Sequence, residues 1–356
     1  MIKELKLKNF KCFVDDKVAF KNLTIFTGAN AAGKSSVIQA LLLYEKAQKE
    51  AGKLLDVTDI LGIEVGSPKN LVAQNAKGAD KADFTIGMNA HDVSFYINKE
   101  NNLDIYAEAE KDAEPVNICY LNAERIGPRM FYRAGGSEKF RQDGSNALYL
   151  MERADSAGVM LPDMLILDSR SRKFSYHVES WMGLILGEMQ LRTQIEPEKA
   201  QATLSIKNDL VDTPVIPTLT GFGISYELAV VIAGLWAASQ ENEILVVENP
   251  EAHLHPSAQS MIGKFLAMIS ASGTQVVVET HSEHVIDGAR VQMYALGMTD
   301  QILVNYLSNE NSEIKITELS VDEKGELSDW PDGFFDQKQM DLRELFLLRR
   351  GNGSHK

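Results

Sequence analysis

Residues 28–35 combine the residue types and the spacing of a loop that binds phosphate groups. They read GANAAGKS and match the pattern G-x-x-x-x-G-K-[ST]. The glycines let successive backbone N–H groups point at an anion, the Lys34 ammonium can reach the β- and γ-phosphates, and the Ser35 hydroxyl can ligate Mg²⁺. The pattern therefore predicts binding of ATP with Mg²⁺. The expected nucleotide contacts in this loop are Asn30, Gly33, Lys34, Ser35 and Ser36.

A carboxylate follows an apolar run at residues 244–247. This run predicts a buried strand, and Glu248 lies at its end. Mg²⁺ keeps several water ligands and needs a carboxylate opposite the Ser35 hydroxyl. We therefore predict that Ser35 and Glu248 hold the Mg²⁺ ion.

Two further segments could face the phosphates. Residues 276–279 predict another buried strand, and His281 follows it at a place where the γ-phosphate could lie. Residues 219–225 open a strongly apolar helix, so their N–H groups and the positive end of the helix could face an anion. The expected contacts in this second segment are Thr220, Gly221, Gly223 and Ser225.

The elements before and after the phosphate loop predict how it is positioned. Residues 2–10 and 17–20 alternate in the manner of two antiparallel strands, and residues 23–27 predict a short apolar strand that leads into the loop. A helix is expected from Ser35 to about Lys49. Four short runs separated by Gly, Asn and Asp then predict an antiparallel sheet region. These runs are residues 84–88, 93–98, 103–107 and 116–121.

The rest of the chain reads as an insertion followed by alternating strands and helices. The alternation begins at residue 244 and is typical of a parallel sheet with crossover helices. We therefore expect three parts. Residues 1–139 hold the phosphate loop and an antiparallel β lobe, residues 140–210 form a helical insertion, and residues 211–356 hold the segment 219–225, Glu248, His281 and the C-terminal part of the chain.

The composition is that of an ordinary globular protein, with 44% hydrophobic and 24% charged residues. The longest apolar stretch, residues 228–238, is too short to span a bilayer, and two cysteines cannot make a disulfide framework. We therefore expect a cytoplasmic protein with no membrane partner. The net charge of −14 argues against a surface that is basic all over, but residues 1–53 carry ten lysines against five acidic residues. This asymmetry leaves DNA binding open.

The order of the motifs resembles a known family. They are TGANAAGKSSVIQALLL, LTGFGIS, ILVVENPEAHLHPSAQ and VVVETHSEHVIDGARV, with AERIGP at residues 123–128 and WPDGFFD at residues 330–336. The chain is similar to the ABC-type ATPase heads of the SMC, RecF and OLD kind, and most closely to the OLD-like bacterial AAA ATPases. The resemblance spans residues 2 to about 349. It implies an α/β P-loop NTPase with an antiparallel β lobe, a parallel core sheet and a helical insertion.

The resemblance also implies roles for single residues. In that family two heads face each other, and each ATP is held by the phosphate loop of one subunit and the signature segment of the other. Here Glu248 matches the Walker B acid, His281 the switch histidine, and residues 220–225 the signature, in which either Thr220 or Ser225 supplies the hydroxyl. Asn249 stands where many ABC ATPases have a catalytic Glu. A neutral Asn can orient water but cannot act as a general base, so we expect slow hydrolysis or a role for Glu251 as the base.

The implied function is an ATPase that forms a homodimer or higher homo-oligomer around nucleotide. It would act as a switch or sensor for a separately encoded effector, in bacterial defence against phage or plasmids. The chain lacks the heptads of long coiled-coil arms, and the roughly 70 residues after His284 leave no room for the nuclease domain that larger OLD proteins append. An alternative is an ATP-bound assembly scaffold with negligible hydrolysis.

Some residues allow more than one reading. A metal-dependent nuclease could use the histidines and carboxylates of the two C-terminal motifs, although packing beside the sheet also explains the first two histidines. Arg125 contacts either phosphate, the partner head or a buried carboxylate. A basic spot at residues 170–173 could touch DNA. The candidate nuclease ligands are His253, His255, His281, His284, Glu248, Glu251 and Glu279.

Overall fold

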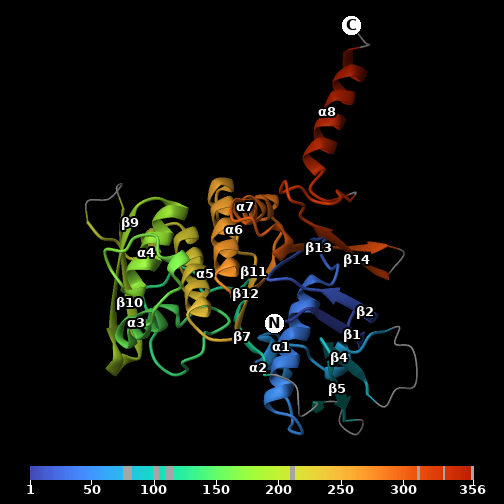
Figure 1. Ribbon diagram of the computed structural model, residues 1–356, viewed down its shortest axis with the longest axis horizontal. Helices are drawn as coiled ribbons and strands as arrows, with labels where there is room; N and C mark the ends of the chain where they lie inside the picture. Colours follow the sequence, from blue (N-terminus) through green and yellow to red (C-terminus); the bar gives the residue numbers. More distant parts are fainter. Residues whose placement is uncertain are drawn as a thin grey trace.

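The computed structural model describes residues 1–74, 82–98, 104–109, 115–208, 213–310, 313–331 and 333–353. A six-stranded sheet with the order β14-β13-β3-β12-β11-β7 runs through its centre (Figure 1). All neighbouring strands are parallel except β13 and β14. The predicted parallel core sheet is therefore present. Its strands are β3 (Leu23–Gly28), β7 (Asn117–Leu121), β11 (Glu243–Glu248), β12 (Gln275–Glu279), β13 (Ile302–Glu310) and β14 (Glu313–Ser320).

The core sheet is covered on both faces, which explains why its strands read as continuous apolar runs. Successive side chains of a strand point to opposite faces. In β3, Ile25 belongs to one hydrophobic cluster and Phe26 to the other. In β12, Val276 and Val278 join the cluster of Ile25, and Val277 joins that of Phe26.

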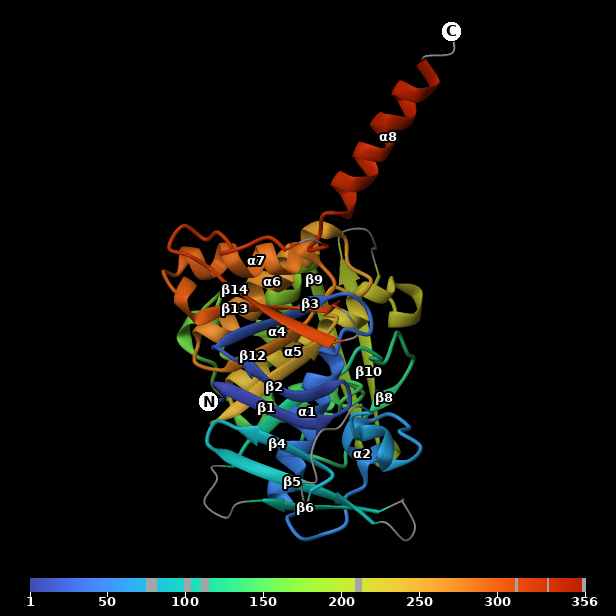
Figure 2. The ribbon, with the colours of Figure 1, turned by 90° about the vertical axis from the view of Figure 1, so that its right-hand side faces the viewer.

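An antiparallel lobe and two helices supply the cluster that contains Phe26. The lobe is a five-stranded sheet with the order β2-β1-β4-β5-β6. Figure 2 shows these strands one below another. Its aromatic residues stack, with the rings of Phe84 and Phe95 4.5 Å apart. The elements are β1 (Glu4–Phe10), β2 (Phe13–Ala19), β4 (Phe84–Met88), β5 (His91–Ile97), β6 (Ile105–Ala109), α1 (Lys34–Lys49) and α2 (Val57–Leu61).

One predicted strand lies elsewhere than expected. The run 116–121 was expected in the antiparallel region, but as β7 it pairs in parallel with β11 at the edge of the core sheet. Burial explains the difference, because Cys119 and Leu121 are fully buried in the cluster that contains Ile25. A short apolar run does not by itself reveal which sheet it joins.

Three helices cover the other face of the core sheet. α5 (Phe222–Ala238) packs on β7 and β11, whereas α6 (Pro256–Ala271) packs on β12 and on α7 (Glu283–Ala295). Glycines allow the close approach of α6 and α7: a Cβ at Gly263 would lie 2.1 Å from the backbone oxygen of Val285, and one at Gly288 2.0 Å from that of Ser260. The two helices therefore pack backbone against backbone at these positions.

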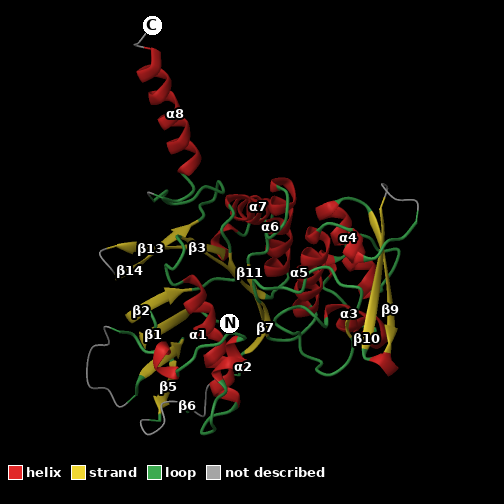
Figure 3. Cartoon of the chain, turned by 180° about the vertical axis from the view of Figure 1, so that it is seen from behind, coloured by secondary structure: helices red, strands yellow, loops and turns green. Residues whose placement is uncertain are grey.

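The inserted region 140–210, expected to be helical, is half helix and half sheet. α3 (Ala147–Ala157) and α4 (Phe174–Leu186) are followed by a hairpin of β9 (Met189–Glu196) and β10 (Gln201–Asn208), which also pairs with β8 (Tyr132–Arg133). Figure 3 shows this hairpin on the outside of α3 and α4. In β10 Ala202, Leu204 and Ile206 alternate with half-buried residues, as in a sheet that faces the core on one side.

The C-terminal segment 330–336 is anchored by its aromatic residues. Phe334 is 1% exposed and its ring packs 5.5 Å from that of Tyr306 and 4.8 Å from that of Trp330. After this anchor, α8 (Gln337–Gly353) stands clear of the body (Figure 1), with exposed apolar residues such as Leu345 and Phe346. Short 3-10 helices complete the chain: η1 (Pro68–Leu71), η2 (Asp163–Leu165), η3 (Pro197–Lys199), η4 (Pro217–Leu219) and η5 (Thr299–Gln301).

Within the described ranges, no helix has both the length and the apolar character needed to cross a bilayer.

Candidate functional site

The phosphate loop joins β3 to α1, as predicted. Gly28 and Gly33 have φ angles of 133° and 94°, and a Cβ at Gly28 would lie 2.0 Å from the backbone oxygen of Leu307. Only glycine fits this position beside β13. The Lys34 ammonium folds across the loop and donates to the carbonyls of Gly28 at 3.0 Å and Ala29 at 2.7 Å. Burial lowers the pKa of Lys34, while Glu279 raises it.

Ser35 faces a carboxylate that the sequence reasoning did not assign to the nucleotide site. Its hydroxyl donates to Glu279, with Oγ lying 3.2 Å from Oε1 and 3.1 Å from Oε2. Glu279 ends β12, the strand next to β3, and is 5% exposed. Burial and the neighbouring Glu248 raise the pKa of Glu279 to about 7, whereas Lys34 and the Ser35 hydroxyl lower it. An acid at the end of a second buried strand was the signal that could have revealed it.

Glu248 ends β11 in register with Glu279, but its hydrogen bonds point to the other side. It accepts from the Tyr120 hydroxyl at 2.9 Å and from the backbone N–H of Ala123 at 3.2 Å. Both donors belong to β7 or to the residues just after it. Burial raises the pKa of Glu248, and these two hydrogen bonds lower it. In the sheet, β12 with Glu279 lies between β11, which carries Glu248, and β3, which leads to the loop before Ser35.

The turn after β11 holds Asn249 and Glu251 in different settings. Asn249 has a φ of 44°, and its side-chain oxygen Oδ1 is buried without a hydrogen-bond partner. Glu251 accepts from the Thr280 hydroxyl at 2.8 Å and from the backbone N–H of His281 at 2.7 Å. Glu251 therefore fixes the segment that carries the predicted switch histidine. Burial and Lys34 lower the pKa of His281.

Arg125 is buried and joins the turn after β11 to helix α5. Its guanidinium donates to the backbone oxygens of Glu248 at 2.5 Å and Asn249 at 2.6 Å, and it lies 5.3 Å from the ring centre of Tyr226. Burial raises the pKa of Glu227, the next residue on α5, to about 8, and the charge of Arg125 opposes this rise. Among the described residues Arg125 forms no ion pair with a carboxylate, because its hydrogen bonds go to backbone oxygens, so the predicted salt bridge is not formed.

The signature segment 220–225 begins just before α5 and continues into its first turn, and α5 packs on β7 and β11. The Thr220 hydroxyl donates to the backbone oxygen of Pro217 at 2.8 Å, and Ser225 is buried with its Oγ 3.5 Å from the Tyr132 hydroxyl. Leu219 and Phe222 are 74% and 54% exposed. Gly221 has open space where a Cβ would stand, and Gly223 packs against the backbone of His253. The segment thus presents an apolar, exposed start of a helix.

Two histidines of the C-terminal motifs, His253 and His255, serve packing and capping. His253 lies between the rings of Phe222 and Tyr226, with ring centres 5.4 and 4.8 Å away. His255 accepts from the backbone N–H of Ser257 and so caps the start of α6. In the described part of the chain, no group of three or more His, Cys, Asp or Glu residues could hold a metal ion. The basic spot includes Arg170, which pairs with Asp168.

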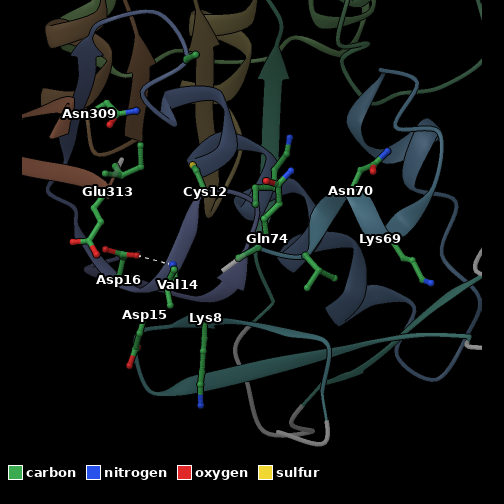
Figure 4. A pocket seen from close by; sticks show the side chains of 15 residues that line it. Lys8, Cys12, Val14, Asp15, Asp16, Lys69, Asn70, Gln74, Asn309 and Glu313 are labelled. Atoms are coloured by element: carbon green, nitrogen blue, oxygen red, sulfur yellow. Dashed lines mark hydrogen bonds between the residues drawn. The ribbon is translucent and has the colours of Figure 1, made fainter. Parts of the chain in front are cut away.

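A cavity of about 1030 Å³ lies beside the phosphate loop and is lined by the turn between β1 and β2 (Figure 4). This turn packs on the loop, because a Cβ at Gly33 would lie 2.9 Å from the Cys12 sulfur, and Lys11 donates to Gln39 of α1. The cavity has charged walls of both signs. They include Lys8, Lys11, Lys69, Asp15, Asp16 and Glu313.

The chain matches two protein families and is similar to one known protein over part of its length. The AAA ATPase domain family matches residues 1–182 and 183–286, and the family described as Protein of unknown function (DUF3696) matches residues 298–345. The Old nuclease of Escherichia phage P2 is 28% identical over 90 residues, which span 22% of this chain and 15% of that protein.

Solved SMC heads share the fold. The chain is similar to an Smc head bound to the C-terminal winged-helix domain of ScpA, with 13% identity, 91% of this chain and 98% of that chain covered, and a TM-score of 0.53. A second Smc head, with an extended coiled coil and the C-terminal domain of ScpA from Pyrococcus furiosus, gives the same identity and TM-score over 97% of this chain and 99% of that chain. The architecture is therefore that of an ABC-type head.

Proposed function

Because the chain belongs to the AAA ATPase domain family, we propose that it binds Mg²⁺-ATP at the phosphate loop, hydrolyses it slowly and acts as a nucleotide-dependent switch. The observation that carries the proposal is the assembly at the carboxyl ends of β3 and β12. There the Lys34 ammonium lies across the loop, and the Ser35 hydroxyl meets a buried carboxylate. A glycine-rich turn that only closes a hairpin would not require this lysine and this buried carboxylate.

In the proposed complex, Lys34 leaves the carbonyls of its own loop and places its charge on the β- and γ-phosphates. The N–H groups at the start of α1 face the same anion. A bound Mg²⁺ ion would neutralise part of the phosphate charge. The hydroxyl of Ser35 and the carboxylates at the ends of β11 and β12 fit this ion, because Mg²⁺ prefers oxygen ligands. We place the nucleoside in the cavity beside Cys12.

Hydrolysis is proposed to be slow. Asn249 can orient a water molecule but cannot take its proton. Glu251 is held by Thr280 and by the backbone of His281, so its first role in the proposal is to position that histidine. The alternative of an ATP-bound scaffold with negligible hydrolysis rests on the same Asn249. Steady-state phosphate release separates the two: turnover above the Lys34→Ala background supports the ATPase, and its absence with tight ATP binding supports the scaffold.

We propose that two heads close around two nucleotides. Support comes from two exposed apolar side chains, Leu219 just before the signature segment and Phe222 at the start of α5. The test is the molar mass by light scattering, with and without ATP. A monomer in both conditions, with full turnover, would reject this part of the proposal.

We also propose an effector and a role in defence, which the family resemblance supports. We propose a cytoplasmic location, which the free cysteines Cys12 and Cys119 support. A pull-down from the native host, comparing the wild type with Lys34→Ala, tests for an effector whose binding depends on nucleotide. DNA binding through Arg172 and Lys173 is open to a mobility-shift assay.

A further inference from the structure

We propose that β9 pairs in antiparallel fashion with β9 of a second copy of this chain, so that two three-stranded sheets join into one. β9 is the last strand in the order β8-β10-β9, on the outside of α3 and α4 (Figure 3). The contact uses none of the residues that our proposal assigns to the nucleotide, so it forms without ATP. Together with the ATP-dependent contact between heads, it would link pairs of heads into larger assemblies.

The outer edge of β9 carries backbone groups that can pair with another strand. Neighbouring residues of an antiparallel strand point their N–H and C=O groups to alternate sides. Ile206 of β10 exchanges hydrogen bonds with Val215, so Leu191, its partner in β9, faces away from β10. Thr193 and Ile195 face the same way as Leu191. Within the described ranges, no strand or loop pairs with the backbone of these two residues.

The free stretch of this edge ends at a definite residue on each side. The N–H of Leu191 donates to the carboxylate of Glu179 at 2.7 Å, and Pro197, just after the strand, has no N–H. The stretch between them, residues 192–196, has Gln194 at its centre. Two copies related by a two-fold axis therefore use the whole stretch when Gln194 lies opposite the partner subunit's Gln194.

Backbone hydrogen bonds form in both directions in this register. The N–H of Thr193 donates to the C=O of the partner subunit's Ile195, and the N–H of that residue donates back to the C=O of Thr193. Natural sheets usually blunt such an edge with proline, a bulge or a very short strand. β9 is eight residues long and contains no proline. Its edge is therefore suited to pairing.

The charged side chains of β9 favour a second copy as the occupant of this edge. Arg192 lies two residues before Gln194 and Glu196 two residues after it, all three on the more exposed face of the strand. In the proposed register each Arg192 lies directly opposite the partner subunit's Glu196, and opposite charges at such positions stabilise the pair of strands. Glu196 also pairs with Lys199, an exposed contact that it can share. The strand is thus complementary to itself.

Space for another strand borders this edge. A cavity of about 690 Å³ is lined by Leu191, Arg192 and Thr193 of β9 together with residues of α3 and α4. The two helices therefore do not close over the edge. Leu191 and Ile195 are only partly buried against the core, and a second copy would cover them further.

Disulfide cross-linking tests the pairing and its register. Opposite residues that share no hydrogen bond have Cα atoms about 4.5 Å apart, within the range of a disulfide. Gln194→Cys should therefore form linked dimers on mild oxidation without nucleotide. Gln190→Cys, on the same face of β9, is the matched control, because its two copies would lie about 27 Å apart. We expect about tenfold less dimer from this control. The wild type gives the background from exposed Cys12.

Charge reversal tests whether the partner is a second copy. In the Gln194→Cys chain, Arg192→Glu or Glu196→Arg alone places like charges opposite each other, and either should lower the yield of dimer about fivefold or more. The two reversals together restore opposite charges and should return the yield to that of Gln194→Cys. Circular dichroism of each variant checks that it is folded.

Three results would overturn the proposal. They are a yield from Gln194→Cys no higher than the wild-type background, an equal yield from Gln190→Cys, and a double reversal that stays as low as the single ones. The first of these would leave the edge of β9 to a strand of another protein. Because the cross-link forms without ATP, these results are separate from a failure of the proposed nucleotide switch.

Discussion

The phosphate loop and the signature segment serve the same nucleotide in our proposal, but the chain completes only one of them. At the loop, Lys34 is 3% exposed and bonded to two carbonyls, and Ser35 is bonded to Glu279. At the signature segment, Leu219 and Phe222 point to solvent. The loop follows β3, whereas α5 packs on β7 and β11. The contacts at the phosphate loop are complete within one chain, whereas the signature segment is exposed. This difference fits a nucleotide site that two subunits share.

The largest effect is expected for a substitution in the phosphate loop. Lys34→Ala removes the charge that faces the β- and γ-phosphates, so ATP affinity should fall about 100-fold or more, the scale of losing strong hydrogen bonds to a charged group. The fold should persist. Calorimetry measures the affinity, and Lys46→Ala on the same helix, where Lys46 pairs with Glu50 near the surface, is the control. Equal ATP affinity in the wild type and Lys34→Ala would contradict the assignment of this loop to the nucleotide site.

A substitution at the signature segment should lower ATP turnover without changing ATP affinity. Gly221→Arg adds a bulky side chain in open space at the start of α5, and Gly221 has a φ of −67° that arginine tolerates. We expect turnover to fall about 100-fold, the scale of losing transition-state donors, with ATP affinity kept. This position is a cleaner probe than Gly223 or Ser225, because Gly223 packs against His253 and Ser225 is buried.

Mixing variants from the two halves sharpens the comparison. A heterodimer of Lys34→Ala and Gly221→Arg has one site with an intact loop and an intact signature. An equal mixture should therefore regain about a quarter of wild-type turnover if the sites act independently. No rescue in a mixture where heterodimers are demonstrated would contradict independent shared sites.

A smaller effect is expected for Glu251→Gln. The amide keeps the size of the side chain but replaces one of the two acceptors that hold Thr280 and the backbone of His281. We expect turnover to fall about tenfold, with ATP affinity unchanged, because His281 loses part of its support. Glu283→Gln, on a half-buried residue in the first turn of α7, is the control. A loss of about 100-fold or more would instead support Glu251 as the general base.

A last prediction concerns the link between the two halves and appears as a pH dependence of stability, not as a change of ATP turnover. The pKa of Glu227 is about 8 in the folded protein, well above its usual value, because the side chain is buried. The folded state then binds a proton that the unfolded state releases above about pH 4.5, so stability falls as the pH rises from about 5 to 8. Glu227→Gln should flatten this fall by up to ~3 kcal/mol. Urea unfolding at several pH values measures it, and parallel curves for both proteins would contradict it.

The sequence was sufficient where chemistry and local pattern coincide. It predicted the phosphate loop between β3 and α1, the carboxylate at the end of β11 and the alternation of β12 and α7, since these depend on neighbours in the chain. It did not reveal that Ser35 meets Glu279, because that contact depends on β12 lying next to β3, a tertiary fact. For the same reason the run 116–121 was placed in the wrong sheet.

Two other features were hidden for different reasons. The hairpin of β9 and β10 was expected to be helical, because sequence pattern alone did not resolve the less regular region around it. Arg125 was recognised as a residue of interest, but its partners are backbone oxygens of residues 248 and 249, which carry no sequence signal. A buried arginine that holds main-chain groups can be found only from coordinates.

The position of β3 has a consequence for how the chain is made. β3 is synthesised early, yet both of its partners in the sheet, β12 and β13, follow more than 245 residues later. Until the ribosome has delivered residue 279, the apolar strand 23–28 has neither of its partner strands and is exposed to aggregation. Contacts of such long range make folding slow. A nascent chain released before β12 should therefore fail to bind ATP even though its phosphate loop is complete.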